Sequence, residues 1–66
     1  MRFVIYTADH EPPHVHVIAD GEARIDIVSL KVMTQGGLSD RDVCRAVDVI
    51  RANHDLFLDA WRKYHG

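Results

Sequence analysis

The period of the hydrophobic pattern changes once along this chain, at Gly36-Gly37. Before this glycine pair, apolar and polar residues alternate, which is the period of a β-strand with one buried face. After it, apolar residues recur every three or four positions, which is the period of an amphipathic helix. With 66 residues the chain has room for a single domain, 1–66, with a β half at 1–35 and a helical half at 38–65.

Four segments of the β half are predicted to be strands. They are rich in β-branched and aromatic residues, or they alternate between apolar and polar positions. Pro12 and Pro13 interrupt the series, because proline has no backbone N–H to donate to a sheet. We expect strands over residues 2–8, 14–19, 22–28 and, after a tight turn, 29–33.

The turn between the second and third predicted strands fixes the register of their hairpin. A two-residue loop would pair apolar residues with polar ones across the strands, which a period of two does not tolerate. A three-residue loop ending at Gly21 makes the apolar sets coincide, and we expect this glycine to adopt the left-handed conformation that such loops use. On the polar face, this register places His14 opposite Asp26 and His16 opposite Arg24.

The helical half begins with a strong start signal. Ser39 is a favourable N-cap residue, and Asp42 follows it at the third position, where an acidic residue suits the positive end of the helix dipole. The apolar stripe continues to Tyr64 without a change of phase, but one helix of that length would be longer than the sheet, so we expect a break near 53–55. The predicted fold class is α+β: an antiparallel sheet of three or four strands followed by two C-terminal helices, or one kinked helix, packed on one face.

Composition excludes several classes of protein. The single cysteine excludes an internal disulfide and suits a reducing compartment, and the net charge of −2 excludes a basic field that would attract nucleic acid to the whole surface. The chain has neither an apolar run long enough to cross a membrane nor a signal-peptide pattern, so we expect a cytoplasmic protein without a membrane partner. Because so small a domain buries little surface, we also expect a homodimer or a tight complex with another protein.

Several stretches of the chain resemble one family of small prokaryotic proteins. They are DHEPPHVHV at 9–17, GEARIDI at 21–27, GGLSDRDV at 36–43 and NHDLFLDAW at 53–61. Through them, nearly the whole chain is similar to domain-of-unknown-function family 4160. Such proteins are often encoded beside a member of domain-of-unknown-function family 2442. The resemblance therefore implies the toxin-like component of a toxin–antitoxin module, with an antitoxin-like protein as its partner.

Three of the five histidines lie between positions 10 and 16. In an extended strand His14 and His16 project from one face, with Asp26 and Arg24 across the hairpin. A carboxylate fixes the tautomer of an imidazole, and a guanidinium suits a phosphate group. We therefore interpret these four residues as the candidate catalytic groups of a small metal-independent ribonuclease. One imidazole would take a proton, the other would give one, and no cofactor is required.

An alternative interpretation uses the same histidines to bind a metal. His14 and His16, with His10 or Asp9 as the third ligand, form a candidate site for a divalent transition metal such as zinc. The protein would then be a non-enzymatic regulatory module that recognises a metal or a partner through its histidine face. Half-exposed histidines on the polar face of a small sheet also need no role beyond hydrogen bonding. The sequence leaves these interpretations open.

Overall fold

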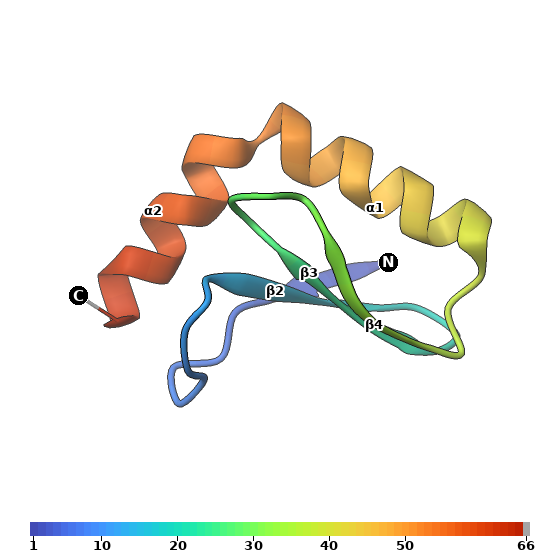
Figure 1. The fold of residues 1–66 in the computed structure, drawn as a ribbon, viewed down its shortest axis with the longest axis horizontal. Helices are drawn as coiled ribbons and strands as arrows, with labels where there is room; N and C mark the ends of the chain where they lie inside the picture. The colour runs from blue at the N-terminus through green and yellow to red at the C-terminus, as the bar shows by residue number, and fades with distance from the viewer. Residues whose placement is uncertain (66) are drawn as a thin grey trace.

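A computed structural model describes residues 1–65 as a four-stranded antiparallel sheet and two helices (Figure 1). The strands lie in the order β1-β2-β3-β4, so that each pairs with its neighbour in sequence. The predicted α+β fold is confirmed, with four strands and two separate C-terminal helices. The elements are β1 (Arg2–Val4), β2 (His14–Ile18), β3 (Glu22–Asp26), β4 (Val32–Gly36), α1 (Asp40–Ala52) and α2 (His54–His65).

The hairpin of β2 and β3 has the predicted register. His14 lies opposite Asp26, and His16 lies opposite Arg24. Alternation sends the apolar residues between them to the other face of the sheet, where they form the centre of the core. The fully buried residues of these two strands are Val15, Val17, Ala23 and Ile25.

Gly21 is needed for a different reason from the expected one. Its backbone does not adopt the left-handed conformation, which Gly37 adopts instead with φ +80°. A side chain at Gly21 would collide with the carbonyl oxygen of Gly36 and would lie 2.5 Å from the carbonyl carbon of Gly37. The turn between β2 and β3 therefore packs against the end of β4 so closely that no Cβ atom fits between them.

We expect Gly21→Ala to lower the free energy of unfolding by about 1–3 kcal/mol, because the new methyl group must displace backbone on both sides. Gly36→Ala is the matched comparison, since its methyl group would lie 3.1 Å from the carbonyl oxygen of Glu22 and would need a smaller adjustment. Urea unfolding followed by circular dichroism measures both variants. If Gly36→Ala costs as much as Gly21→Ala, the close approach at the turn is not the cause.

The fourth strand begins later than the predicted segment at 29–33. The Asp26 carboxylate accepts hydrogen bonds from the backbone N–H groups of Val28 and Ser29, at 2.8 and 2.9 Å, and closes a turn after β3. Leu30 continues the irregular stretch with φ +64°. The prediction is wrong over its first residues because side-chain bonding to the backbone replaces strand pairing there.

The first strand is shorter than the segment 2–8 that its β-branched and aromatic residues predict. β1 makes its last pair between Val4 and His16, and the chain then leaves the sheet. Residues 5–13 form the β1–β2 loop, which runs outside the sheet before the chain enters β2. This early departure matters for the site, because it allows Asp9 to return to the polar face of the sheet.

The helical half begins and breaks where the sequence indicates. The Ser39 hydroxyl accepts a hydrogen bond from the N–H of Asp42 at 3.1 Å, as an N-cap does. α1 is capped by Asn53, whose side chain donates to the carbonyl oxygen of Val49 at 2.8 Å, and α2 starts at the next residue. Both helices lie on one side of the sheet, and α2 extends past the end of the sheet towards the β1–β2 loop (Figure 1).

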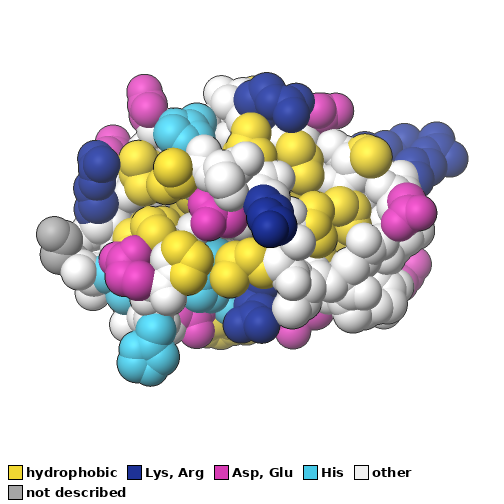
Figure 2. All heavy atoms as spheres, in the orientation of Figure 1, with side chains coloured by type: hydrophobic (Ala, Val, Ile, Leu, Met, Phe, Trp, Pro, Cys, Tyr) yellow, Lys and Arg dark blue, Asp and Glu magenta, His cyan; other side chains and the backbone are white. Residues whose placement is uncertain are grey.

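The surface is mixed in character. Figure 2 shows acidic and basic side chains interspersed on the face in view, together with exposed apolar groups. Leu56 on α2 is the most exposed of the large apolar side chains within residues 1–65, at 67%. No helix within residues 1–65 is long and apolar enough to cross a membrane.

Candidate functional site

His14 is the first residue of β2 and is buried, with 4% of its surface exposed. Its Nδ1 lies 2.8 Å from the carbonyl oxygen of Pro12. A carbonyl oxygen only accepts hydrogen bonds, so Nδ1 carries a hydrogen, and in the neutral form of the ring Nε2 then carries the lone pair. That Nε2 lies 3.1 Å from Oδ2 of Asp9 without the alignment of a hydrogen bond, and within residues 1–65 this buried nitrogen has no hydrogen-bond partner. Such an atom costs about 1–3 kcal/mol unless something satisfies it.

His16 projects from the same face two residues further along β2, and its side chain is 12% exposed. Its Nδ1 lies 2.7 Å from Oε2 of Glu22, and its Nε2 lies 2.9 Å from Oδ2 of Asp9. The two carboxylates fix the orientation of the ring from opposite sides. In the neutral imidazole one of the two nitrogens has no hydrogen, so only one of these contacts is then a hydrogen bond.

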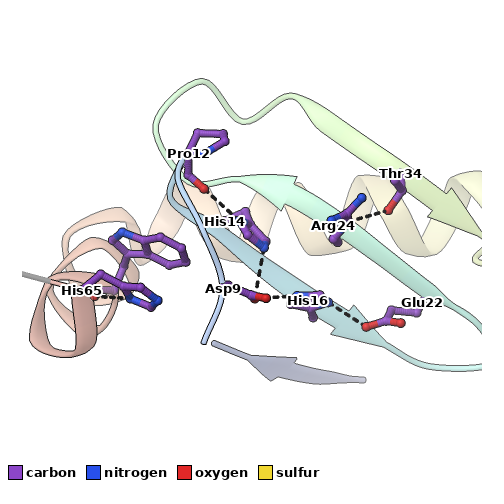
Figure 3. A network of polar contacts seen from close by, with 9 residues as sticks. Asp9, Pro12, His14, His16, Glu22, Arg24, Thr34 and His65 are labelled. Atoms are coloured by element: carbon purple, nitrogen blue, oxygen red, sulfur yellow. Dashed lines mark hydrogen bonds and ion pairs between the residues drawn. The ribbon is translucent and has the colours of Figure 1, made fainter. Parts of the chain in front are cut away.

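Asp9 of the β1–β2 loop reaches both imidazoles with a single carboxylate oxygen (Figure 3). Its side chain is 26% exposed, so the carboxylate lies between the histidines and solvent. Burial raises the pKa of Asp9, but the hydrogen bond from His16 and the charges of His14 and His16 outweigh this effect and leave the pKa below its usual value. Asp9 is therefore a carboxylate at neutral pH, which is the form that binds a metal ion.

The three side chains converge on one point. A ligand atom from each of Asp9, His14 and His16 lies within 4.8 Å of the other two. Donor atoms around a tetrahedral zinc ion stand ~3.3 Å apart at metal–ligand distances of about 2.0–2.1 Å, so small side-chain movements would seat such an ion here. The opposite nitrogens are held by the Pro12 carbonyl and by Glu22, which is the support that a metal-binding imidazole receives in known sites.

Arg24 and Asp26 have the predicted backbone positions but not the predicted contacts. The Asp26 carboxylate is used by the turn after β3, and the Arg24 Nε donates to the hydroxyl of Thr34 on β4 at 3.4 Å. Within residues 1–65, the carboxylates that contact the histidine pair are those of Asp9 and Glu22. The expected contact between Asp26 and the pair is therefore not formed within residues 1–65, and a catalytic role of Asp26 and Arg24 stays a prediction.

His10 was one of the predicted metal ligands, but the fold does not bring it to His14 and His16. It is exposed in the β1–β2 loop and contributes no ligand atom to the group formed by the described residues. The loop turns Asp9 inwards, so Asp9 takes the place of the third ligand. Of the two third ligands that the sequence offered, the structure brings only Asp9 to His14 and His16.

The C-terminal helix covers the His14 end of the site. The Trp61 indole packs against the ring of His14, with centroids 5.3 Å apart, and is 2% exposed. Its Nε1 donates to the carboxylate of Glu11 at 3.4 Å, and its ring stacks on His65 with centroids 3.7 Å apart. Trp61 therefore connects the sheet, the β1–β2 loop and the end of α2, and it shields His14 from water.

Comparison with protein families identifies the chain. The model of the family described as domain of unknown function (DUF4160) matches residues 1–62, which include all four strands, α1 and most of α2. The chain belongs to this family. Searches of the curated proteins and of the solved structures found no match to the DUF4160 chain.

Two supporting groups of the DUF4160 site were missed by the sequence interpretation. Glu22 lies opposite Ile18 in the hairpin, on the diagonal from His16, and this follows from the predicted register. Diagonal neighbours on a sheet are within reach of a long side chain, so the predicted register held a signal that could have identified Glu22. The Pro12 carbonyl had no comparable signal, because its direction depends on the path of the β1–β2 loop.

Proposed function

We propose that this DUF4160 protein is a binding module that holds one divalent transition metal ion between Asp9, His14 and His16. The observation that carries this proposal is the buried Nε2 of His14, which finds no hydrogen-bond partner among residues 1–65 while Nδ1 contacts a carbonyl oxygen. A metal ion satisfies such a nitrogen when a carboxylate and a second imidazole lie beside it. This is the metal-binding alternative that the sequence left open, with Asp9 in place of His10.

The same geometry gives less support to acid–base cleavage of RNA. In that mechanism two imidazole nitrogens face the substrate, and one takes a proton while the other gives one. Here Nε2 of both histidines faces Asp9, and Nδ1 of His16 faces Glu22. The two carboxylates would also repel the phosphate of an RNA from the imidazoles. The ribonuclease hypothesis stays a prediction, and the metal-binding proposal is the one that these contacts support.

The donor set selects the class of ion. Two imidazole nitrogens and one carboxylate oxygen suit Zn²⁺ and its neighbours Fe²⁺, Co²⁺ and Ni²⁺. Ca²⁺ and Mg²⁺ prefer sites made of oxygen atoms alone. Three protein donors also leave a coordination position for water or an external ligand, as in zinc sites that act on substrates. The proposed ion would therefore have three ligands from the protein and at least one that the protein does not supply.

Zinc titration of the metal-free protein should show a single ion per chain and a more stable fold. At a free zinc concentration of about 100 times the Kd, the stabilisation is about 2.7 kcal/mol, which appears as a rise in Tm that a chelator reverses. Trp61 is the only tryptophan of the chain, and its ring lies beside that of His14. Co²⁺ or Ni²⁺ should therefore quench the tryptophan fluorescence, and native mass spectrometry gives the stoichiometry.

His10→Ala is the matched control for this titration. His10 lies in the same loop as Asp9, is exposed, and contributes no atom to the three-residue group. This variant should bind zinc as tightly as the wild-type chain does. A wild-type protein without a bound ion in native mass spectrometry, or a variant that loses the ion with His10, would exclude the proposed site.

The role in a toxin–antitoxin module stays a prediction, since membership of this family assigns no activity. The predicted partners, a second copy of the chain or an antitoxin-like protein, also stay predictions. Metal binding is compatible with growth inhibition, because an ion with an open coordination position would act within the same histidine site.

A further inference from the structure

The face of the sheet opposite the helices carries a row of polar side chains that starts at the histidine site. In the register of the sheet, His16, Arg24 and Thr34 stand side by side on β2, β3 and β4. Their side chains project from the same face, because directly paired residues of neighbouring strands do so. Both helices lie on the other side of the sheet (Figure 1), and Trp61 of α2 reaches the His14 end of this face, so the row can be approached from Arg24 onwards.

Arg24 is the member of the row with unused hydrogen-bonding capacity. Its guanidinium carries several N–H donors, of which Nε makes one long hydrogen bond to Thr34. Within residues 1–65 it forms no ion pair with a carboxylate, although Glu22 and Asp26 lie two positions away on the same strand. The Glu22 carboxylate contacts His16 (Figure 3), and the Asp26 carboxylate accepts hydrogen bonds from the turn after β3. The guanidinium is therefore free to hold an anion.

Local charge makes binding of an anion depend on the metal. Without the ion, the carboxylates of Asp9 and Glu22 outweigh the single positive charge of Arg24 and repel an anion. A divalent ion offsets both carboxylates, so the positive charge of Arg24 is no longer opposed by them. The same ion offers the open coordination position on which an oxygen of the anion can bind.

We infer that the metal ion and Arg24 together bind a phosphate group on this face of the sheet, an inference that rests on the proposed metal site. One phosphate oxygen takes the open position of the ion, and the guanidinium holds the others through its planar pair of donors. The two anchors come from adjacent strands, because His16 and Arg24 are directly paired in the register of β2 and β3. Phosphate monoesters and the phosphodiesters of nucleic acids present these same oxygens.

Phosphorus NMR of inorganic phosphate added to the Co²⁺-loaded protein tests the inference. Phosphate bound at the ion lies close to unpaired electrons, so its resonance broadens with the bound fraction, and the concentration dependence gives the affinity. We expect broadening with the wild-type protein and none with Zn²⁺-loaded protein, which carries no unpaired electrons. Calorimetry should detect phosphate binding to the Zn²⁺-loaded protein and none to the metal-free protein.

Arg24→Gln should weaken phosphate binding roughly ten-fold or more, which is the effect of removing one hydrogen bond from a charged donor, and should leave Co²⁺ affinity unchanged. Arg51→Gln is the matched control, because the Arg51 guanidinium pairs with Asp48 at 3.0 Å on α1, on the opposite face. Equal phosphate binding by both variants overturns the role of Arg24. Absence of phosphate binding by a protein that holds its Co²⁺ overturns the inference but leaves the metal site intact, whereas failure to hold Co²⁺ overturns both.

Two further ligands separate the sources of phosphate. Tighter binding of phenyl phosphate than of the dinucleotide UpU supports a phosphate monoester, and the reverse order supports RNA. Acetate is the control for charge without tetrahedral geometry. If acetate binds as tightly as phosphate and depends on Arg24 to the same extent, the assignment to a phosphate group is overturned.

Discussion

Replacing Trp61 with alanine should lower the free energy of unfolding by about 3–5 kcal/mol, the range found for truncation of buried aromatic side chains. Domains have about 0.05–0.15 kcal/mol of stability per residue, so this loss approaches the whole stability of a chain of 66 residues. Trp61 is 2% exposed and contacts His14 on β2, Glu11 in the β1–β2 loop and His65 on its own helix. Urea unfolding followed by far-ultraviolet circular dichroism measures the effect.

Tyr64→Ala is the matched control on the same helix, because Tyr64 is 52% exposed. Substitutions at such surface positions usually change stability by less than about 0.5 kcal/mol. Trp61→Phe should recover part of the loss, since a phenyl ring still packs against His14 but cannot donate to Glu11. If Trp61→Ala and Tyr64→Ala cost the same, α2 is anchored to the sheet by something other than the indole.

The central hairpin was predictable because two independent constraints agree there. Alternation assigns the apolar residues of each strand to one face, and a loop of three residues is the length that brings the two apolar sets together. The observed pairing of His14 with Asp26 and of His16 with Arg24 follows from these constraints alone. The start of α1 was predictable for a similar reason, since the Ser39 side chain bonds within its own helical turn.

The contacts of the histidine site were harder to predict because they join segments that have no common period. Asp9 lies in a loop, and only the path of that loop decides whether Asp9 or His10 faces the histidines. Asp26 does not contact the histidines because backbone N–H groups of the following turn lie closer to it. Val28 and Ser29 donate their N–H groups to its carboxylate. An aspartate at the end of a strand and before a tight turn itself indicates that its carboxylate will accept hydrogen bonds from the backbone of that turn.

The burial of His14 likewise could not be predicted from the alternation of apolar and polar residues along β2. Polar-face residues of a sheet with helices on one side are expected to be exposed, and His16 is in fact partly so. His14 is covered because α2 runs past the end of the sheet and places Trp61 against it. Trp61 lies on the apolar stripe of the helical half, but the spacing of that stripe does not indicate that an imidazole would be its neighbour. This burial is what turns an ordinary surface histidine into one whose Nε2 lacks a partner.

Single substitutions should rank the residues of the site by their effect on zinc affinity. Asp9→Ala, His14→Ala and His16→Ala should each weaken zinc binding by more than about 100-fold, since groups that only support a ligand already account for about 10–100-fold. Glu22→Gln should fall within that lower range. It weakens the acceptor for Nδ1–H of His16 but leaves all three ligand atoms in place. Calorimetric titration in competition with a chelator of known affinity measures the series.

The order within this series separates metal binding from the acid–base hypothesis, because the two assign different partners to the histidines. If Asp26 oriented His14, then Asp26→Asn would disturb the site while Asp9→Asn would not. If the three-residue group holds the ion, Asp26→Asn should leave zinc affinity unchanged, since its carboxylate is bonded to the turn. Circular dichroism of the metal-free variants shows that each has folded before its affinity is compared. If Glu22→Gln lowers zinc affinity more than His14→Ala does, His14 is not a ligand of the ion. Metal binding would then not explain why Nε2 of His14 lacks a hydrogen-bond partner within residues 1–65.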